Sequence, residues 1–161
     1  MEGAWTTGRR REAIMIVRQV MSTKVFTVLP DKTLFVAGEL MDWAHVRHVP
    51  VVDAHGRLVG IVSHRDLLRA SISSVETHIV RAERRQHLAQ ITVAQVMQTP
   101  THTVTPETTV RQAAATMRAF HVGCLPVIEH GVLVGIVTAH DMLGLIVHSP
   151  SLSEPQASSA A

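Results

Sequence analysis

The sequence predicts an α+β fold in which one β-α-β-β-α unit occurs twice and the two copies pack back to back. First, the chain aligns with itself at an offset of about 76 positions, and the segments 58–62 and 133–137 both read Leu-Val-Gly-Ile-Val. Second, each copy has an apolar stripe at helical spacing followed by two β-branched runs. One three-stranded sheet with helices on one face would leave its other face uncovered, so we expect the second copy to cover it.

The same elements are expected in the same order in both copies. Thr33 and Thr109 each follow a Pro and an acidic residue, which is typical of a helix start. Gly56 and Gly131 each lie between two β-branched runs, which indicates hairpins with glycine-containing turns. The expected elements are extended pieces at 15–17 and 25–28, a helix at 33–44, strands at 49–52 and 58–62 and a helix from 63, with counterparts at 91–93, 101–104, 109–120, 125–128, 132–137 and from 138.

Composition and the repeat divide the chain into five parts. These are an N-terminal arm at 1–14, a first repeat at 15–70, a helical linker at 71–90, a second repeat at 91–146 and a tail at 147–161. The tail consists mainly of Ser, Ala and Pro and is expected to be disordered. The linker region has no Gly or Pro, which predicts one extended helix or two consecutive ones. Its basic cluster at 81–85 is expected to be a solvated face, with anion binding as the alternative.

The composition argues against several classes of protein. The formal net charge is only +2 and the basic residues gather in two short clusters, which does not predict a nucleic-acid-binding face. No stretch approaches the roughly 18 apolar residues that a membrane span needs, and the apolar run at 13–17 is too short for an export signal. The single cysteine, Cys124, cannot form an internal disulfide and is expected to be a small buried residue. We therefore expect a cytoplasmic protein without membrane or nucleic-acid partners.

A Ser/Thr-x-x-Asp sequence occurs in each copy where the last strand is expected to pass into the last helix. These residues are Ser63 and Asp66 in the first copy and Thr138 and Asp141 in the second. A helix start presents unpaired N–H groups and positive potential to a phosphate, and a carboxylate can accept hydrogen bonds from both hydroxyls of a ribose. The same spacing is also close to a helix capping box, which stabilises a helix by about 0.5–2 kcal/mol without any ligand. Both roles can coexist.

The two copies differ in charge. Arg47, His48 and Arg65 of the first copy correspond to Gly123, Cys124 and His140 of the second. An arginine can hold a phosphate through two hydrogen bonds. We therefore expect the first copy to supply most phosphate contacts and the two sites to differ in affinity or ligand.

The order of the short motifs resembles the CBS (cystathionine β-synthase) domain family. Both copies contain Val-Met, Thr-Val-x-Pro-x-x-Thr, His-Val-x-x-h-Pro-Val, in which h is an apolar residue, and then Leu-Val-Gly-Ile-Val-(Ser/Thr)-x-x-Asp. The full series twice is similar to a stand-alone CBS pair, or Bateman module. This resemblance implies that the two repeats pack as a pseudo-twofold pair with two clefts between the CBS units. It also implies an adenosyl ligand such as AMP, ADP, ATP, S-adenosylmethionine or a dinucleotide, and pairing into flat homodimers.

In the family, the Ser/Thr and Asp hold phosphate and ribose, and an apolar slot holds the adenine. Carried onto this chain, the slot residues of the first copy are Val25, Phe26, Val46 and Ile61. Those of the second copy are Thr101, His102, Val122 and Ile136. Together with the charge pattern, the candidate nucleotide-binding residues are Val25, Phe26, Val46, Arg47, His48, Ile61, Ser63, Arg65, Asp66, Thr101, His102, Val122, Ile136, Thr138, His140 and Asp141.

Catalytic and metal sites are not predicted. The eleven histidines are scattered, and His45 and His48 are separated by an expected helix end. No paired carboxylates, nucleophile–base pair or phosphate-binding glycine loop occurs. We expect a non-enzymatic sensor that requires no cofactor, binds an adenine nucleotide or another adenosyl compound and signals to an effector protein by conformational change. The alternatives are a homodimerisation module with vestigial clefts, and an enzyme or nucleic-acid binder that uses the basic arm.

Overall fold

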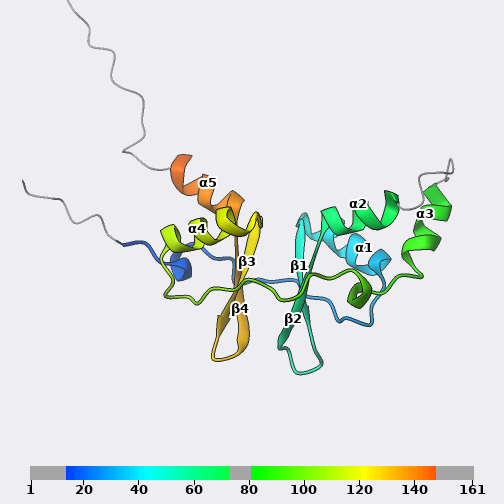
Figure 1. Cartoon of the computed structure of the whole chain (residues 1–161), viewed down its shortest axis with the longest axis horizontal. Coiled ribbons are helices and arrows are strands. Elements are labelled where there is room, and N and C mark those ends of the chain that lie inside the picture. Colours follow the sequence, from blue (N-terminus) through cyan, green and yellow to red (C-terminus); the bar gives the residue numbers. More distant parts are fainter. Residues whose placement is uncertain (1–13, 73–80, 148–161) are drawn as a thin grey trace, which may run out of the picture.

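The computed structural model describes residues 14–72 and 81–147 of the 161-residue chain. The two hairpins stand side by side at the centre, with the helices of each repeat on the outer side of its own hairpin (Figure 1). The elements are η1 (Val17–Gln19), α1 (Leu34–Ala44), β1 (His48–Val52), β2 (Leu58–Ser63), α2 (His64–Ile72), α3 (Arg81–Leu88), η2 (Val93–Gln95), α4 (Val110–Phe120), β3 (Cys124–Glu129), β4 (Val132–Thr138) and α5 (Ala139–Val147). The predicted α+β pair of repeats is confirmed.

The helix starts and hairpin turns are formed by the residues that the sequence indicated. Thr33 and Thr109 are the N-caps of α1 and α4, and each side-chain oxygen accepts a hydrogen bond from a backbone N–H of the first turn. Gly56 and Gly131 have φ angles of 75° and 80°, a region that glycine adopts without strain. Cys124 is buried as expected, and burial raises the pKa of its thiol to about 12.

The predicted three-stranded sheet is reduced to two strands in each repeat. β1 pairs with β2, and β3 with β4, both antiparallel. The extended pieces expected at 25–28 and 101–104 each pair with a hairpin through a single parallel bridge, Val28 to Val51 and Val104 to Val127. The ladder cannot continue beyond Pro30 or Pro106, because proline has no N–H to donate.

The two repeats exchange their first segments. Val17 and Arg18 donate backbone hydrogen bonds to Thr108 and Pro106 of the second repeat, at 2.8 and 2.9 Å. η1 therefore lies beside α4, far from the first repeat's helices (Figure 1). In the same way, Val93 donates to Lys32 at 2.8 Å, which places η2 on the first repeat. Each packed unit thus contains one segment from the other copy, so sequence repeat and packed unit are not the same.

The exchanged segments complete two separate hydrophobic cores. Val17 is fully buried in the core of the second repeat, together with Leu125, and Val93 is fully buried in that of the first, together with Leu34. After each segment the chain crosses the hairpin next to it. A Cβ on Gly135 would lie 2.7 Å from Met21 Sδ, so the glycine permits this close crossing.

The structure describes the two ends of the predicted linker region. α2 ends at Ile72 and α3 begins at Arg81, so helices occupy both ends of the predicted region. Glu83 and Arg85 are exposed, as expected of a solvated face. Most of the predicted arm, most of the predicted tail and the middle of the linker lie outside the described residues. Within 14–72 and 81–147, no helix has the length and apolar character needed to cross a membrane.

Candidate functional site

The two strand-to-helix turns are built by hydrogen bonds within the Ser/Thr-x-x-Asp sequences. Asp141 Oδ2 accepts hydrogen bonds from the backbone N–H and the hydroxyl of Thr138, both at 2.7 Å. Asp66 Oδ2 accepts the equivalent pair from Ser63 at 2.8 and 2.5 Å. The capping role is therefore confirmed in both copies, and it fixes each carboxylate at the start of its helix.

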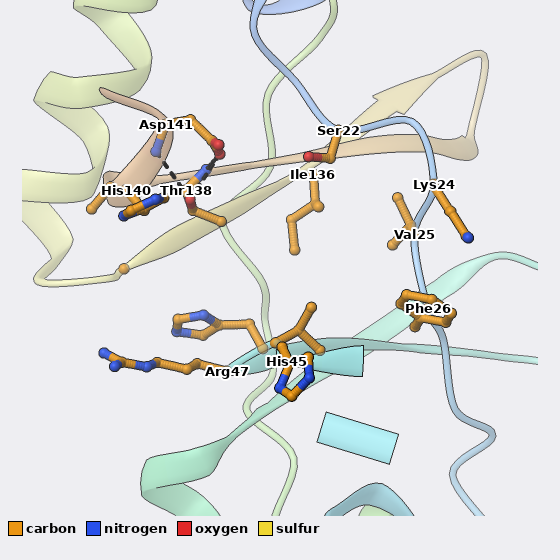
Figure 2. Close-up of a pocket in the computed structure, with 14 residues that line it drawn as sticks. Ser22, Lys24, Val25, Phe26, His45, Arg47, Ile136, Thr138, His140 and Asp141 are labelled. Carbon is orange, nitrogen blue, oxygen red and sulfur yellow. Dashed lines mark hydrogen bonds between the residues drawn. The ribbon is translucent and has the colours of Figure 1, made fainter. Parts of the chain in front are cut away.

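A cavity of about 580 Å³ lies between the two repeats and contains one of these turns (Figure 2). Its size suits a small-molecule site. Both repeats contribute to its walls. The lining residues are Ser22, Lys24, Val25, Phe26, His45, Val46, Arg47 and His48 from the first part of the chain and Gly123, Ile136, Thr138, Ala139, His140 and Asp141 from the second repeat.

Polar and apolar groups occupy different parts of this cavity. Thr138, His140 and Asp141 lie together at the start of α5, across the cavity from Arg47 (Figure 2). Ile136 and Val25 lie further along it (Figure 2). The arrangement combines a carboxylate, a hydroxyl and a cation with an apolar slot.

An aromatic group and a second cation form the other end of the cavity. Phe26 packs edge-to-face on Trp43 with ring centroids 5.5 Å apart, and Lys24 Nζ lies 5.8 Å from the centre of the Phe26 ring. The Trp43 side chain is largely exposed, so its indole reports on the environment next to the cavity.

The cavity contains only part of the predicted site residues, and it combines residues of the two copies that the sequence assigned to separate sites. The residues that line it are Val25, Phe26, Val46, Arg47, His48, Ile136, Thr138, His140 and Asp141. The residues that do not are Ile61, Ser63, Arg65, Asp66, Thr101, His102 and Val122. The expectation that each slot draws on one copy is therefore wrong for this cavity, because the crossing chain brings Val25, Phe26 and Val46 to Ile136 instead of Ile61.

Several lining residues were not predicted. Ser22 reaches the cavity because it bridges to Ile136, with backbone hydrogen bonds of 2.9 and 3.0 Å. Lys24 follows it along the same wall (Figure 2). His45 lies there because it ends α1 in the left-handed conformation, with φ 53°. In the sequence, the one sign of these residues was that Lys24 corresponds to Pro100 in the other repeat, a difference in charge.

His48 is a half-buried titratable group in the cavity wall. A Cβ on Gly123 would lie 3.3 Å from its ring, so the glycine leaves room for the imidazole. Burial lowers the pKa of His48; Arg47 and Arg65 act in the same direction and Asp66 opposes them. The imidazole is therefore neutral near pH 7.

This depressed pKa makes the stability of the fold depend on pH. Below pH about 6.5 the unfolded chain binds a proton at His48 that the folded chain does not, so the free energy of unfolding falls as the pH falls. We expect His48→Gln to flatten this slope in urea unfolding measured from pH 7.5 to pH 5.5, roughly the range of histidine titration. His55→Gln, in the exposed hairpin turn, is the control. An unchanged slope in His48→Gln would contradict the assignment.

Metal-ligating residues do not gather in the described part of the chain. Within residues 14–72 and 81–147, no group of three or more His, Cys, Asp or Glu side chains could hold a metal ion. His45 and His48 both line the cavity, but Asp141 is the sole carboxylate among the described residues around it.

Comparison with known proteins agrees with this fold and with the duplicated motif. A CBS domain-containing protein of Dictyostelium discoideum is 35% identical over 134 residues, which cover 83% of this chain and 92% of that protein. The CBS domain of a CBS domain-containing membrane protein from Sphaerobacter thermophilus superposes with a TM-score of 0.68 at 34% identity, covering 82% of this chain and 88% of that one. CBSX2, solved in complex with AMP, gives a TM-score of 0.68 at 24% identity and covers 83% and 96%. The family model described as CBS domain matches residues 17–73 and 93–148, so the chain belongs to the CBS domain family and contains two CBS domains.

Proposed function

We propose that this CBS domain pair is a regulatory module that binds an adenine nucleotide or another adenosyl compound in the cavity between its two repeats. The observation that supports this proposal is the cavity, whose walls bring together the Thr138–Asp141 turn, an apolar slot and Arg47. A nucleotide has matching parts: a ribose diol, a flat base and an anionic phosphate. That CBSX2 was solved with AMP supports this ligand class for the shared fold.

Each part of the ligand has a partner of suitable chemistry. Asp141 Oδ1 is available to accept from the ribose hydroxyls, since the capping hydrogen bonds use Oδ2. The Thr138 hydroxyl and the start of α5 suit a phosphate oxygen, and Arg47 supplies the positive charge. Val25, Val46 and Ile136 suit the adenine ring.

Binding at this place would act on the relative position of the repeats. The cavity walls come from both, so a ligand that contacts Arg47 and Asp141 at once favours one arrangement of the two units. We propose that this arrangement is what an effector protein in the cytoplasm recognises.

The helices also offer a surface for assembly. Phe120 of α4 and Leu143, Ile146 and Val147 of α5 are more than half exposed. Exposed apolar side chains on neighbouring helices favour a protein interface, and we propose that a second copy of this chain covers them. Light scattering on the purified chain tests this, since the mass of a monomer at micromolar concentration would contradict it. A dimer that binds no ligand would favour the alternative function, a dimerisation module.

Titration with a panel of ligands tests the binding function. AMP, ADP, ATP, S-adenosylmethionine and NADH are added to the purified chain and followed by thermal unfolding and by Trp43 fluorescence in a Trp5→Phe variant. A true ligand at 100 times its Kd adds about 2.7 kcal/mol to the free energy of unfolding, which raises Tm by roughly 5–10 °C. No shift with any adenosyl compound would overturn the function.

A further inference from the structure

The two carboxylates at the strand-to-helix turns differ in how many of their oxygens are already used. In both, Oδ2 accepts the capping hydrogen bonds. Asp66 Oδ1 also accepts a hydrogen bond of 3.0 Å from the side-chain amide of Gln98, and Asp66 is only 6% exposed. Asp141 Oδ1 has no hydrogen bond from any described residue, and Asp141 lines the cavity. A ribose could therefore reach Asp141 directly but would have to displace Gln98 from Asp66.

Gln98 occupies the position that corresponds to Ser22 in the other repeat. Gln98 bridges to Ile61 of β2 in the same way that Ser22 bridges to Ile136 of β4, each through a pair of backbone hydrogen bonds. The backbone geometry is thus shared and only the side chain differs. The serine is too short to use the carboxylate beside it and leaves the cavity open (Figure 2). The glutamine amide reaches its carboxylate and stands where ribose hydroxyls would donate.

The aromatic side chain that corresponds to Phe26 in the other repeat is also engaged in a contact within the chain. His102, the counterpart of Phe26, stacks on Phe120 with ring centroids 3.7 Å apart and an angle of 19°. One face of this ring is therefore covered from within the chain. Phe26 meets Trp43 edge-to-face and remains in the cavity wall.

Fixed positive charges lie near both carboxylates. Lys24 and Arg47 line the cavity with Asp141, and the residues at the corresponding positions of the repeat are Pro100 and Gly123. In the Asp66 turn, Arg65 takes the place of His140. Arg47 also lies beside the Asp66 turn, because its carbonyl accepts a hydrogen bond of 2.9 Å from the His64 N–H, so charge does not select between the two carboxylates.

We propose that each chain binds a single ligand, at Asp141, and that Gln98 closes the pseudo-symmetric position at Asp66 by taking the place of the ribose hydroxyls. This inference rests on the proposed function, because it specifies which of two related carboxylates serves it. It also names the residue that decides between them.

Exchange of the two side chains tests the proposal. Calorimetry with AMP, and with ADP and ATP in parallel, gives the number of sites in the wild type and in Gln98→Ser and Ser22→Gln. We expect one site in the wild type, a second site in Gln98→Ser, and affinity lowered by about tenfold or more in Ser22→Gln, since its amide would reach Asp141. Asp141→Asn should also weaken binding by about tenfold, and Asp66→Asn should leave the wild-type titration unchanged within about twofold. If Asp66→Asn does not fold, the number of sites in Gln98→Ala tests instead whether a ligand can bind at Asp66.

The outcomes separate the inference from the function. Two equal sites in the wild type, or loss of binding in Asp66→Asn with Asp141→Asn unaffected, would overturn the single-site inference and leave the binding function in place. A Gln98→Ser variant with no second site would also overturn it. No heat with any nucleotide in any variant would overturn the proposed function and the inference with it.

Discussion

Replacing Val17 with Asp is expected to unfold the second repeat, although Val17 belongs to the first copy by sequence. Its side chain is fully buried against Leu125 and its neighbours, and its N–H donates to Thr108 at 2.8 Å. A carboxylate there has no hydrogen-bonding partner, so we expect the free energy of unfolding to fall by more than about 4 kcal/mol. Urea unfolding followed by circular dichroism measures this loss.

A control on the same segment separates burial from the loss of apolar character. Ile14 is 77% exposed, so Ile14→Asp should change the free energy of unfolding by no more than about 0.5 kcal/mol. Equal losses in Val17→Asp and Ile14→Asp would contradict the described packing of the segment.

Milder substitutions show which repeat each segment supports. Val17→Ala removes apolar contacts without adding charge and should cost roughly 2 kcal/mol. Its effect on amide hydrogen exchange should appear in β3 and β4, whereas Val93→Ala should affect β1 and β2. If each valine instead weakened the hairpin of its own copy, the exchange of segments would be wrong.

Local features of this fold could be predicted because they depend on near neighbours in the chain. The helix expected at 33–44 is observed as α1, Leu34–Ala44, with Thr33 as its cap. The apolar spacing and the capping hydroxyl both act within one or two turns, so the sequence alone contains them. The hairpins follow for the same reason, since Gly56 and Gly131 provide the positive φ that their turns need.

The exchange of segments could not be predicted, because the repeat makes two arrangements equivalent. Val17 and Val93 stand in matching sequences, so either segment could fill the same gap in either core. A pattern of apolar residues shows that a segment is buried, but not which of two similar units buries it. The mixed cavity escaped prediction for the same reason, since it depends on where the chain crosses at Ser22.

The difference between Ser22 and Gln98 was visible in the sequence but had no meaning there. Its importance depends on the bridge to Ile61, which brings the glutamine amide to Asp66. Arg47 and Arg65 illustrate the same limit. Both were expected in one phosphate site, and the structure places only Arg47 in the cavity wall.

These two arginines give the second large effect, on ligand affinity. Arg47→Ala is expected to weaken binding of an anionic nucleotide by about tenfold or more, because a hydrogen bond to a charged group is worth about 1.5–3 kcal/mol and each 1.4 kcal/mol is a factor of ten. The Arg47 side chain is exposed, so the fold should tolerate the change. Calorimetry with ATP measures the affinity, and the nucleoside adenosine should be affected much less.

Arg65→Ala is the matched control, since Arg65 is also exposed, lies beside the other carboxylate and does not line the cavity. It should leave ATP affinity unchanged within about twofold, apart from the small effect of one distant charge that salt screens. Salt distinguishes the two roles further: ATP affinity should fall with ionic strength less steeply in Arg47→Ala than in the wild type. If Arg65→Ala weakened ATP binding and Arg47→Ala did not, the phosphate would lie in the Asp66 turn. The cavity between the repeats would then not be where this CBS pair senses its ligand.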